Sequence, residues 1–188
     1  QSFTVTVNAV NDAPTLASVD AVSFAEDGST SITLSGSDID TASDDLTYSI
    51  SGGSGATISA ALVGTTVTFT PFANYNGSET FTATVTDGEY DASQTFAVTV
   101  NAVNDAPTLA AVDAVSFDED GSGLTTLVGS DIDTASDGLT YSISGGSEAT
   151  ISAELVGTTV TFTPFANYNG SETFTATVTD GEFVASQT

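Results

Sequence analysis

Short stretches in which apolar and polar residues alternate recur along the whole chain. In 66–70, 80–86 and 95–100 the apolar side chains fall on every second residue, so each stretch presents one apolar face, as a half-buried β-strand does. No stretch keeps a helical period for more than a turn. Pairs of turn-forming residues, such as Asn76-Gly77 and Asp87-Gly88, separate the stretches. The pattern predicts seven strands within the first 100 residues, at 19–24, 31–34, 46–50, 56–60, 66–70, 80–86 and 95–100.

The chain is an internal repeat with a period of 93 residues. Residues 8–95 and 101–188 align without a gap and differ at 11 of 88 positions. Seven short strands in a unit of this size predict an Ig-like sandwich, so the fold class is all-β, with seven-stranded sandwiches in tandem. The phase of the repeat predicts a terminal strand of a preceding repeat at 1–7, a first repeat at 8–100, and a second repeat at 101–188 that lacks its last strand. We therefore expect a window from a longer array.

The composition limits the partners, catalytic groups and metal sites that the chain can have, because it has 25 acidic residues and no Lys, Arg or His. Without cations it has no means of clamping phosphate, which excludes nucleic acid as a partner, and no basic surface for an anionic membrane. No apolar run is long enough to span a bilayer. Without His or Cys, the common catalytic triads and most zinc, copper and iron sites are excluded. A metal site would have to use oxygen ligands, which favours calcium.

Acidic motifs recur at equivalent places in the two repeats. A linker, Asn-Ala-Val-Asn-Asp-Ala-Pro, occupies 8–14 and 101–107. Each repeat also has a Phe-x-Glu-Asp-Gly-Ser segment, an Asp-x-Asp pair and a late Asp after a strand. Any one of these residues could simply form a turn by bonding to its local backbone. Together, in a chain with no cation, they predict a site for a positive ion, because crowded carboxylates repel one another unless something neutralises them.

These motifs resemble those of the cadherin fold family, and most closely the bacterial cadherin-like tandem repeats of giant surface adhesins. The linker is similar to the cadherin D-x-N-D-N-x-P, and Asp131-Ile-Asp133 followed by Tyr141-Ser-Ile143 is similar to D-x-D…Y-S-I. The segment 71–81, repeated at 164–174, looks like the bacterial branch. The resemblance implies Greek-key sandwiches with Ca2+ at their junctions. The cadherin L-D-R-E motif falls near 72–75, which has no carboxylate, so we expect one or two ions, not three.

The family geometry implies which residues would hold calcium. The junction site would use Glu26, Asp27, Asn101, the Val103 carbonyl, Asn104, Asp105, Asp131, Asp133 and Asp180. A half-site toward the preceding repeat would use Asn8, Asn11, Asp12, Asp38, Asp40 and Asp87. A half-site toward the following repeat would use Glu119 and Asp120.

The sequence thus predicts calcium-stiffened extender repeats of a bacterial adhesin, extracellular, either on the cell surface or secreted. Near-identity of the repeats favours a spacer over the alternative, a homophilic or polysaccharide-binding module. Enzyme activity is not expected, because the carboxylates are duplicated, lie in strands and turns, and imply no cleft. The expected partners are neighbouring copies of the repeat. Residues 1–7 would complete the second repeat of the next molecule head to tail, or the same pairing would be covalent within a continuous chain.

Overall fold

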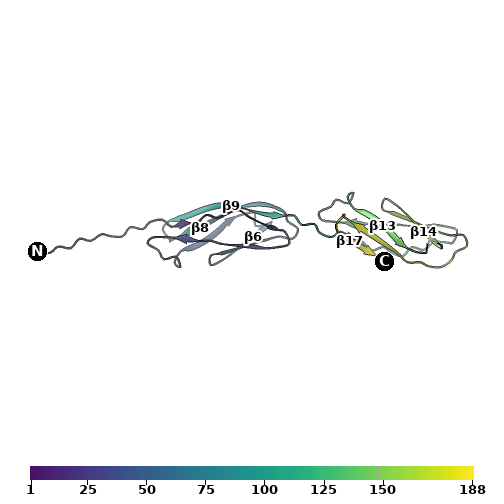
Figure 1. The fold of residues 1–188 in the computed structure, drawn as a ribbon, viewed down its shortest axis with the longest axis horizontal. Coiled ribbons are helices and arrows are strands. Elements are labelled where there is room, and N and C mark those ends of the chain that lie inside the picture. Colours follow the sequence, from purple (N-terminus) through teal and green to yellow (C-terminus); the bar gives the residue numbers. More distant parts are fainter. Residues whose placement is uncertain (148) are drawn as a thin grey trace. The chain divides into compact units, whose positions relative to one another are not determined.

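The computed structural model describes residues 1–147 and 149–188, which form two compact units, Gln1–Val103 (unit 1) and Asn104–Thr188 (unit 2). The division falls inside the linker 101–107. Both units consist of strands and loops, and no helix occurs among these residues, as the ribbon in Figure 1 shows. The expected all-β fold is confirmed.

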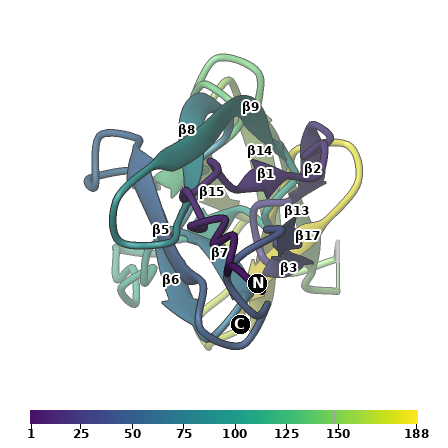
Figure 2. The same ribbon diagram turned by 90° about the vertical axis from the view of Figure 1, so that its left-hand side faces the viewer.

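Unit 1 is a sandwich of two main sheets. One sheet has the order β2-β9-β8-β5 and the other has the order β3-β7-β6. Viewed end-on (Figure 2), β8 and β9 lie on one side and β6 and β7 on the other. The strands are β2 (Val22–Ala25), β3 (Thr30–Thr33), β5 (Thr47–Gly52), β6 (Ile58–Val63), β7 (Thr66–Pro71), β8 (Gly77–Thr86) and β9 (Asp91–Asn101).

These seven strands correspond to the seven that alternation predicts. Two further strands, β1 (Thr15–Leu16) and β4 (Gly36–Ser37), form a separate antiparallel pair. The sequence does not reveal them, because two residues are too few to show a period. Almost every strand pairing is antiparallel, but β2 runs parallel to β9, with Val22 opposite Val98 and Phe24 opposite Val100.

Unit 2 has a similar arrangement of strands, but some of its strands are shorter than those of unit 1. Its strands are β10 (Thr108–Leu109), β11 (Gly123–Thr126), β12 (Gly129–Ser130), β13 (Thr140–Gly145), β14 (Ile151–Val156), β15 (Thr159–Pro164), β16 (Phe174–Thr179) and β17 (Val184–Gln187). The sheets are ordered β13-β16-β17, β11-β15-β14 and β10-β12. Residues 115–118, which match β2, form no strand, and β16 begins later than its counterpart β8.

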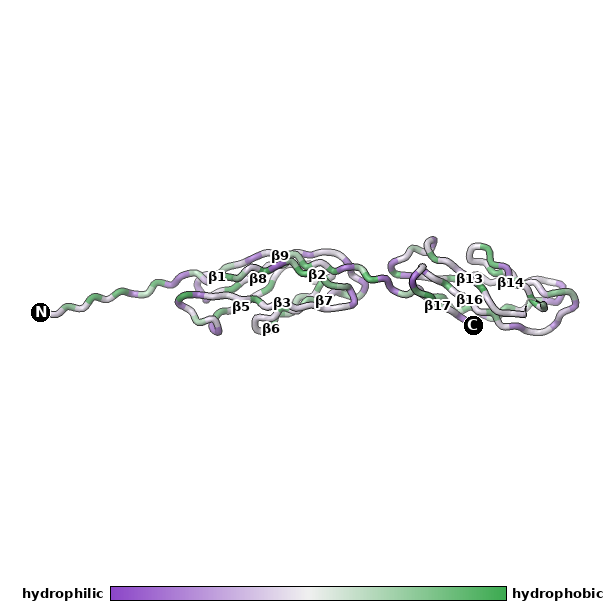
Figure 3. The backbone as a smooth tube through the Cα atoms, in the orientation of Figure 1, coloured by the Kyte–Doolittle hydropathy of each residue, from purple (hydrophilic) through white to green (hydrophobic). Residues whose placement is uncertain are grey.

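The core of each unit forms where the alternating apolar residues of the two sheets meet (Figure 3, green stretches along the strands). In unit 1 Phe69 is fully buried and makes edge-on contacts with Phe81 and Phe96, at ring-centroid distances of 5.2 and 5.9 Å. Val98 and Val100 of β9 are buried beside them. The predicted period of two in β7, β8 and β9 is therefore confirmed by their burial patterns.

Unit 2 keeps part of this core. Phe162 packs against Phe174 at a centroid distance of 5.0 Å. Thr188 aligns with Thr95, so Phe96, Val98 and Val100 of unit 1 have no counterparts within these 188 residues. Unit 2 therefore buries less apolar surface along this edge.

We predict that, in the 188-residue polypeptide, the two units unfold separately and unit 2 unfolds at the lower temperature, because within these residues it buries fewer apolar core side chains than unit 1. Calorimetry at low protein concentration should resolve two transitions. Phe162→Ala should lower only the first, and Phe69→Ala should lower only the second, by about 3–5 kcal/mol of unfolding free energy. A single transition, or a Phe162→Ala effect on the upper one, would contradict this assignment.

Candidate functional site

Two short acidic loops lie at one end of unit 1, and in each of them an Asp side chain accepts hydrogen bonds from the backbone of its own turn. Asp38 follows β4, and its Oδ1 accepts the backbone N–H groups of Asp40 and Thr41, at 2.7 and 2.8 Å. Asp87 follows β8, and its Oδ1 accepts the N–H groups of Glu89 and Tyr90, both at 2.7 Å. Asp commonly makes such bonds to its own backbone two or three residues on, and here they fix the orientation of each carboxylate.

The segment before β1 is tied to both turns. The Asn11 side-chain amide donates to Asp87 Oδ2 at 2.9 Å, and the Asp12 N–H donates to Asp40 Oδ2 at 2.9 Å. The structure thus places Asn11, Asp12, Asp38, Asp40 and Asp87 in one cluster, which we call the acidic end of unit 1.

Unit 2 contains the same arrangement, the acidic end of unit 2. Asp131 Oδ1 accepts the N–H groups of Asp133 and Thr134, both at 2.8 Å. Asn104 donates to Asp180 Oδ2 at 2.8 Å, and the Asp105 N–H donates to Asp133 Oδ2 at 2.7 Å. The two repeats therefore build one local geometry from one sequence pattern.

One carboxylate oxygen at each acidic end is left without a partner. Asp38 Oδ2 and Asp131 Oδ2 are both shielded from solvent and accept no hydrogen bond. A buried charged oxygen without a partner is unfavourable, since it loses its hydration and gains nothing in return. The chain has no Lys, Arg or His that could supply that partner.

The opposite end of unit 1 contains a third such atom, on Glu26. This residue is 5% exposed, its N–H donates to the Asn101 carbonyl at 3.0 Å, and its Oε1 accepts the Val103 N–H at 2.7 Å. Its Oε2 is buried and unpartnered. The parallel pairing of β2 with β9 is what brings Glu26 to Asn101, and the Asn101 amide in turn donates to Ser23 Oγ at 2.9 Å.

The other candidate ligands lie outside these clusters. Asn8, Asp27, Glu119 and Asp120 are exposed. The contact found for Val103 uses its N–H, whereas the sequence-based assignment uses its carbonyl. Within residues 1–147 and 149–188, no three acidic side chains stand together as a group that could hold a metal ion. A calcium site here would therefore also need amide, backbone or water oxygens, and the ligand assignment stays a prediction.

Sequence reasoning missed one further carboxylate cluster, around Glu79 in β8. Glu79 Oε1 accepts the Ser54 N–H at 3.0 Å and the Thr57 hydroxyl at 2.6 Å, and its Oε2 is buried without a partner. Burial raises the pKa of Glu79, but the hydrogen bonds from Thr57 and Ser54 outweigh it and leave the pKa below its usual value. Glu172 bonds in the same way to Ser147 and Thr150. The cluster fixes the turn after β5. Because Glu79 lies far along the chain from Ser54 and Thr57, no local sequence pattern indicates that they meet.

The late Asp of each acidic end has a depressed pKa. For Asp87 the largest cause is the N–H of Tyr90, followed by that of Glu89. For Asp180 partial burial raises the pKa, but the N–H groups of Phe183 and Glu182 and the Asn104 amide together lower it. A depressed folded-state pKa means that the folded chain favours the ionised form, so this stabilisation is complete above the unfolded pKa and is lost as the pH falls through the folded pKa.

We predict that Asp87→Asn destabilises unit 1 near neutral pH and that its difference from the unchanged protein shrinks as the pH falls below 3.8, the ordinary value for this carboxyl. Acid also relieves the repulsion within a chain of net charge −25, so the difference between variants is the informative quantity. It can be measured by chemical denaturation in chelator across pH 2.5–7, roughly the range over which a carboxyl titrates. Asp20→Asn, at an exposed carboxylate, is the matched control. A difference that does not change with pH would contradict the assignment.

Comparison with known proteins agrees with the cadherin-like fold. The chain is similar to domains 1–2 of human protocadherin-24 in two crystal forms, at 19% identity with a TM-score of 0.52 and at 17% identity with a TM-score of 0.51. The alignments cover 94% of this chain and 94% of that one in the first case, and 95% and 93% in the second. The human desmocollin-1 ectodomain is also similar, at 14% identity and a TM-score of 0.44, and the chain spans 36% of its length.

No curated protein matches the chain in sequence. None of the described residues belong to a helix that is long and apolar enough to cross a membrane. The bacterial Ig domain profile matches twice, at residues 11–101 and at residues 104–188, so that the matches together cover most of the sequence. The chain therefore belongs to the bacterial Ig domain family, as a tandem pair of cadherin-like repeats.

Proposed function

We propose that these repeats are calcium-dependent extenders of a bacterial adhesin, extracellular, on the cell surface or secreted. The observation that carries the proposal concerns three of the candidate ligands, Glu26, Asp38 and Asp131. Each has a buried carboxylate oxygen without a partner, in a chain with no cationic side chain. The tandem arrangement of two near-identical sandwiches supports a structural role.

The donor chemistry of the acidic ends fits calcium. Calcium takes 6–8 oxygen ligands at about 2.3–2.6 Å and accepts carboxylate, amide and carbonyl oxygens in flexible geometries. In unit 2, Asp131, Asp133, Asp180 and Asn104 would contribute oxygens to such an ion, and the turns that already orient them would limit the reorganisation on binding. The ion, when bound, would supply the positive charge that the chain lacks.

Rigidity would follow from neutralisation at the linker. The linker holds Asn101, Asn104 and Asp105, and Glu26 is tied by hydrogen bonds to its first residues. Unneutralised carboxylates repel at short range, particularly at low ionic strength. We therefore infer that calcium restricts the linker and that its removal releases it, as expected for an extender that must keep a distal tip away from the cell.

We predict that Asp131→Asn weakens calcium binding by at least about tenfold, or ~1.4 kcal/mol, and leaves unit 2 folded. Asn retains an oxygen for the N–H groups of Asp133 and Thr134 but loses the charge. Calorimetric titration would measure the affinity, and circular dichroism in chelator would monitor the fold. Glu154→Gln removes the same charge from an exposed site on β14 and should change neither. Unfolding of Asp131→Asn in chelator would instead make this carboxylate structural.

We also predict that small-angle scattering at low salt gives a narrower, longer distribution of dimensions in calcium than in chelator. The reason is that calcium would remove the repulsion between carboxylates near the linker. Magnesium, which dehydrates reluctantly and demands near-octahedral geometry, should have a weaker effect at equal concentration. Identical profiles in calcium and chelator would overturn the stiffening role.

A second candidate is a ligand-binding module, and repeated exposed aromatic residues favour it. Phe72 and Phe165 occupy the same loop in the two units, and both are about half exposed. Exposed aromatic rings can stack on sugars, so a glycan array with the double variant Phe72→Ala/Phe165→Ala tests this role. Binding that the double variant abolishes would favour the module over the spacer.

A further inference from the structure

The two repeats differ most along one edge strand. Of their 11 differences, five fall within residues 118–128, the stretch that contains β11 of unit 2. Two of the five place Leu124 and Val128 where unit 1 has Ser31 and Ser35. Because the repeats are otherwise nearly identical, this concentration of changes marks β11 as the strand along which the two units present different surfaces.

These changes expose apolar side chains and remove one from the core. Leu124 pairs with Thr161 of β15 in the same register that β3 keeps with β7, so the strand has not shifted. Leu124 is 64% exposed and Val128 is 59% exposed. Thr125 meanwhile takes the place of Ile32, which packs against the core of unit 1. Neither change stabilises unit 2, so contact with something outside the unit is the better explanation for them.

β11 is also an edge strand, and its open side carries backbone groups that face no other strand. The sheet order is β11-β15-β14, so β15 covers one side of β11 only. On that side the Leu127 N–H donates to the Thr158 carbonyl at 2.8 Å. Antiparallel strands bond at alternate residues, so the N–H and C=O groups of Leu124 and Thr126 point to the open side. In the described part of the chain, no hydrogen bond to these groups is found.

The open side belongs to the topology of the repeat. β3 is likewise the edge of its sheet in unit 1, where β9 is present. In unit 2, β10 follows only the later part of the edge, and its line ends where the Ala110 N–H donates to the Val128 carbonyl at 2.8 Å. In unit 1 a cavity of about 400 Å³, lined in part by residues 17–22 and by Ile32, lies beside β3 at the matching place. An extended segment that continued the line of β10 would therefore have room beside β11.

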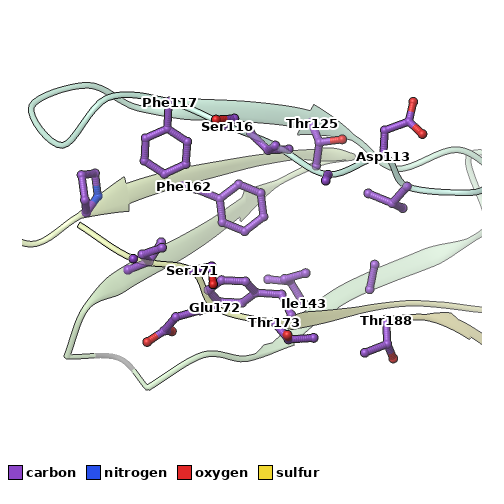
Figure 4. Close-up of a pocket in the computed structure, with 18 of the residues that line it drawn as sticks. Asp113, Ser116, Phe117, Thr125, Ile143, Phe162, Ser171, Glu172, Thr173 and Thr188 are labelled. Atoms are coloured by element: carbon purple, nitrogen blue, oxygen red, sulfur yellow. The ribbon is translucent and has the colours of Figure 1, made fainter. Parts of the chain in front are cut away.

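The surroundings of this open side are acidic. Figure 4 shows Asp113 near Thr125 of β11, and both residues line the same space. Asp118, Glu119 and Asp120 come just before the strand and are exposed, and Asp118 takes the place of an Ala in unit 1. The chain has no Lys or Arg to neutralise them. A partner with basic side chains would supply the complementary charge.

We propose that β11 binds an extended segment of a partner protein in which apolar residues alternate with Lys or Arg. The segment would add to the sheet as a further strand and bond to the N–H and C=O groups of Leu124 and Thr126. Because alternate side chains of a strand point to opposite faces, its apolar side chains would pack on Leu124, and on Val128 where it meets β10. Its basic side chains would then turn toward Asp113 and Asp118. A second copy of this chain does not fit, because it has no Lys or Arg and a net charge of −25.

The test is the binding of a labelled peptide that alternates Val and Lys to the 188-residue polypeptide in chelator, measured by fluorescence anisotropy at moderate salt. Leu124→Ser/Val128→Ser restores the residues of unit 1 without changing any charge, and it should weaken binding about tenfold or more, because apolar contacts are lost. Val63→Ser, which removes an exposed valine from β6 of unit 1, should change the affinity little. Equal affinity of the double variant and the unchanged chain would overturn the proposal.

Two further peptides separate strand addition from simple attraction to an acidic surface. A version of the first peptide with every backbone nitrogen methylated keeps its charge and side chains but has no N–H to donate, so it should bind at least about tenfold more weakly. A peptide that alternates Val and Glu should not bind detectably. Equal binding of the methylated peptide overturns the proposal, as does binding of the Val and Glu peptide. Self-association of the chain that Leu124→Ser/Val128→Ser abolishes would also overturn it, because the occupant would then be a second copy.

A gain-of-function variant locates the site. Ser31→Leu/Ser35→Val together with Ala25→Asp gives unit 1 the exposed residues of unit 2, so the stoichiometry of the peptide should rise from one to two per chain. In the unchanged chain, peptide binding should slow hydrogen exchange at the Leu124 and Thr126 amides. A stoichiometry that stays at one, or protection at other amides only, contradicts the assignment. Because all these measurements are made in chelator, they do not depend on the proposed calcium role, and either proposal can fail alone.

Discussion

The constraint on which this molecule depends is that every negative charge must be accommodated without a positive side chain. The protein responds with backbone N–H groups, side-chain amides and hydroxyls. Asp38, Asp87 and their counterparts in unit 2 each take two backbone N–H groups of their own turn, and Glu79 takes an N–H and a hydroxyl. These donors stabilise one oxygen of each carboxylate well, and a buried oxygen without a partner remains on Glu26, Asp38, Glu79 and Asp131. Binding of an external cation would be most favourable at these oxygens, because the protein itself supplies no hydrogen-bond donor to them.

Most of the fold follows from local patterns, because alternation and turn residues act over a few positions. The strands β7, β8 and β9 are predicted with their buried faces, since Phe69, Val85 and Val98 lie on the apolar side of a period of two. The acidic ends are predicted as groups of residues, and Asn11, Asp40 and Asp87 do meet. What the sequence could not predict is which atoms bond, because the Asn11–Asp87 contact and the Glu79–Ser54 contact join residues far apart in the chain. The contact between the Val103 N–H and Glu26 was not predicted for the same reason, and the expected role of the Val103 carbonyl stays a prediction.

The two units also show that whether a segment forms a strand depends on the strands beside it as well as on its own sequence. Residues 77–86 and 170–179 are identical, yet the first segment is a strand throughout, and the second becomes a strand only at Phe174. The difference begins where the partner β9 is present in one unit and has no counterpart in the other. Residues 115–118 likewise form no strand, although the matching residues of unit 1 form β2 beside β9. The intrinsic β-preference of the residues therefore determines which segments can form strands. Pairing with a neighbouring strand then determines whether such a segment is a strand or a loop.

The parallel pairing of β2 with β9 has a mechanical consequence. A force that stretches the array enters unit 1 through the chain before β1 and leaves through Asn101 at the end of β9. Because β2 and β9 run in the same direction, that force pulls them past each other along their length, and the hydrogen bonds from Val22 to Ala25 carry the load together. Bonds loaded in shear yield as a group, whereas bonds at a peeling edge yield one at a time. We therefore expect this short ladder to resist most of the force on the repeat, with Glu26, which bonds to Asn101 and Val103, at its loaded end.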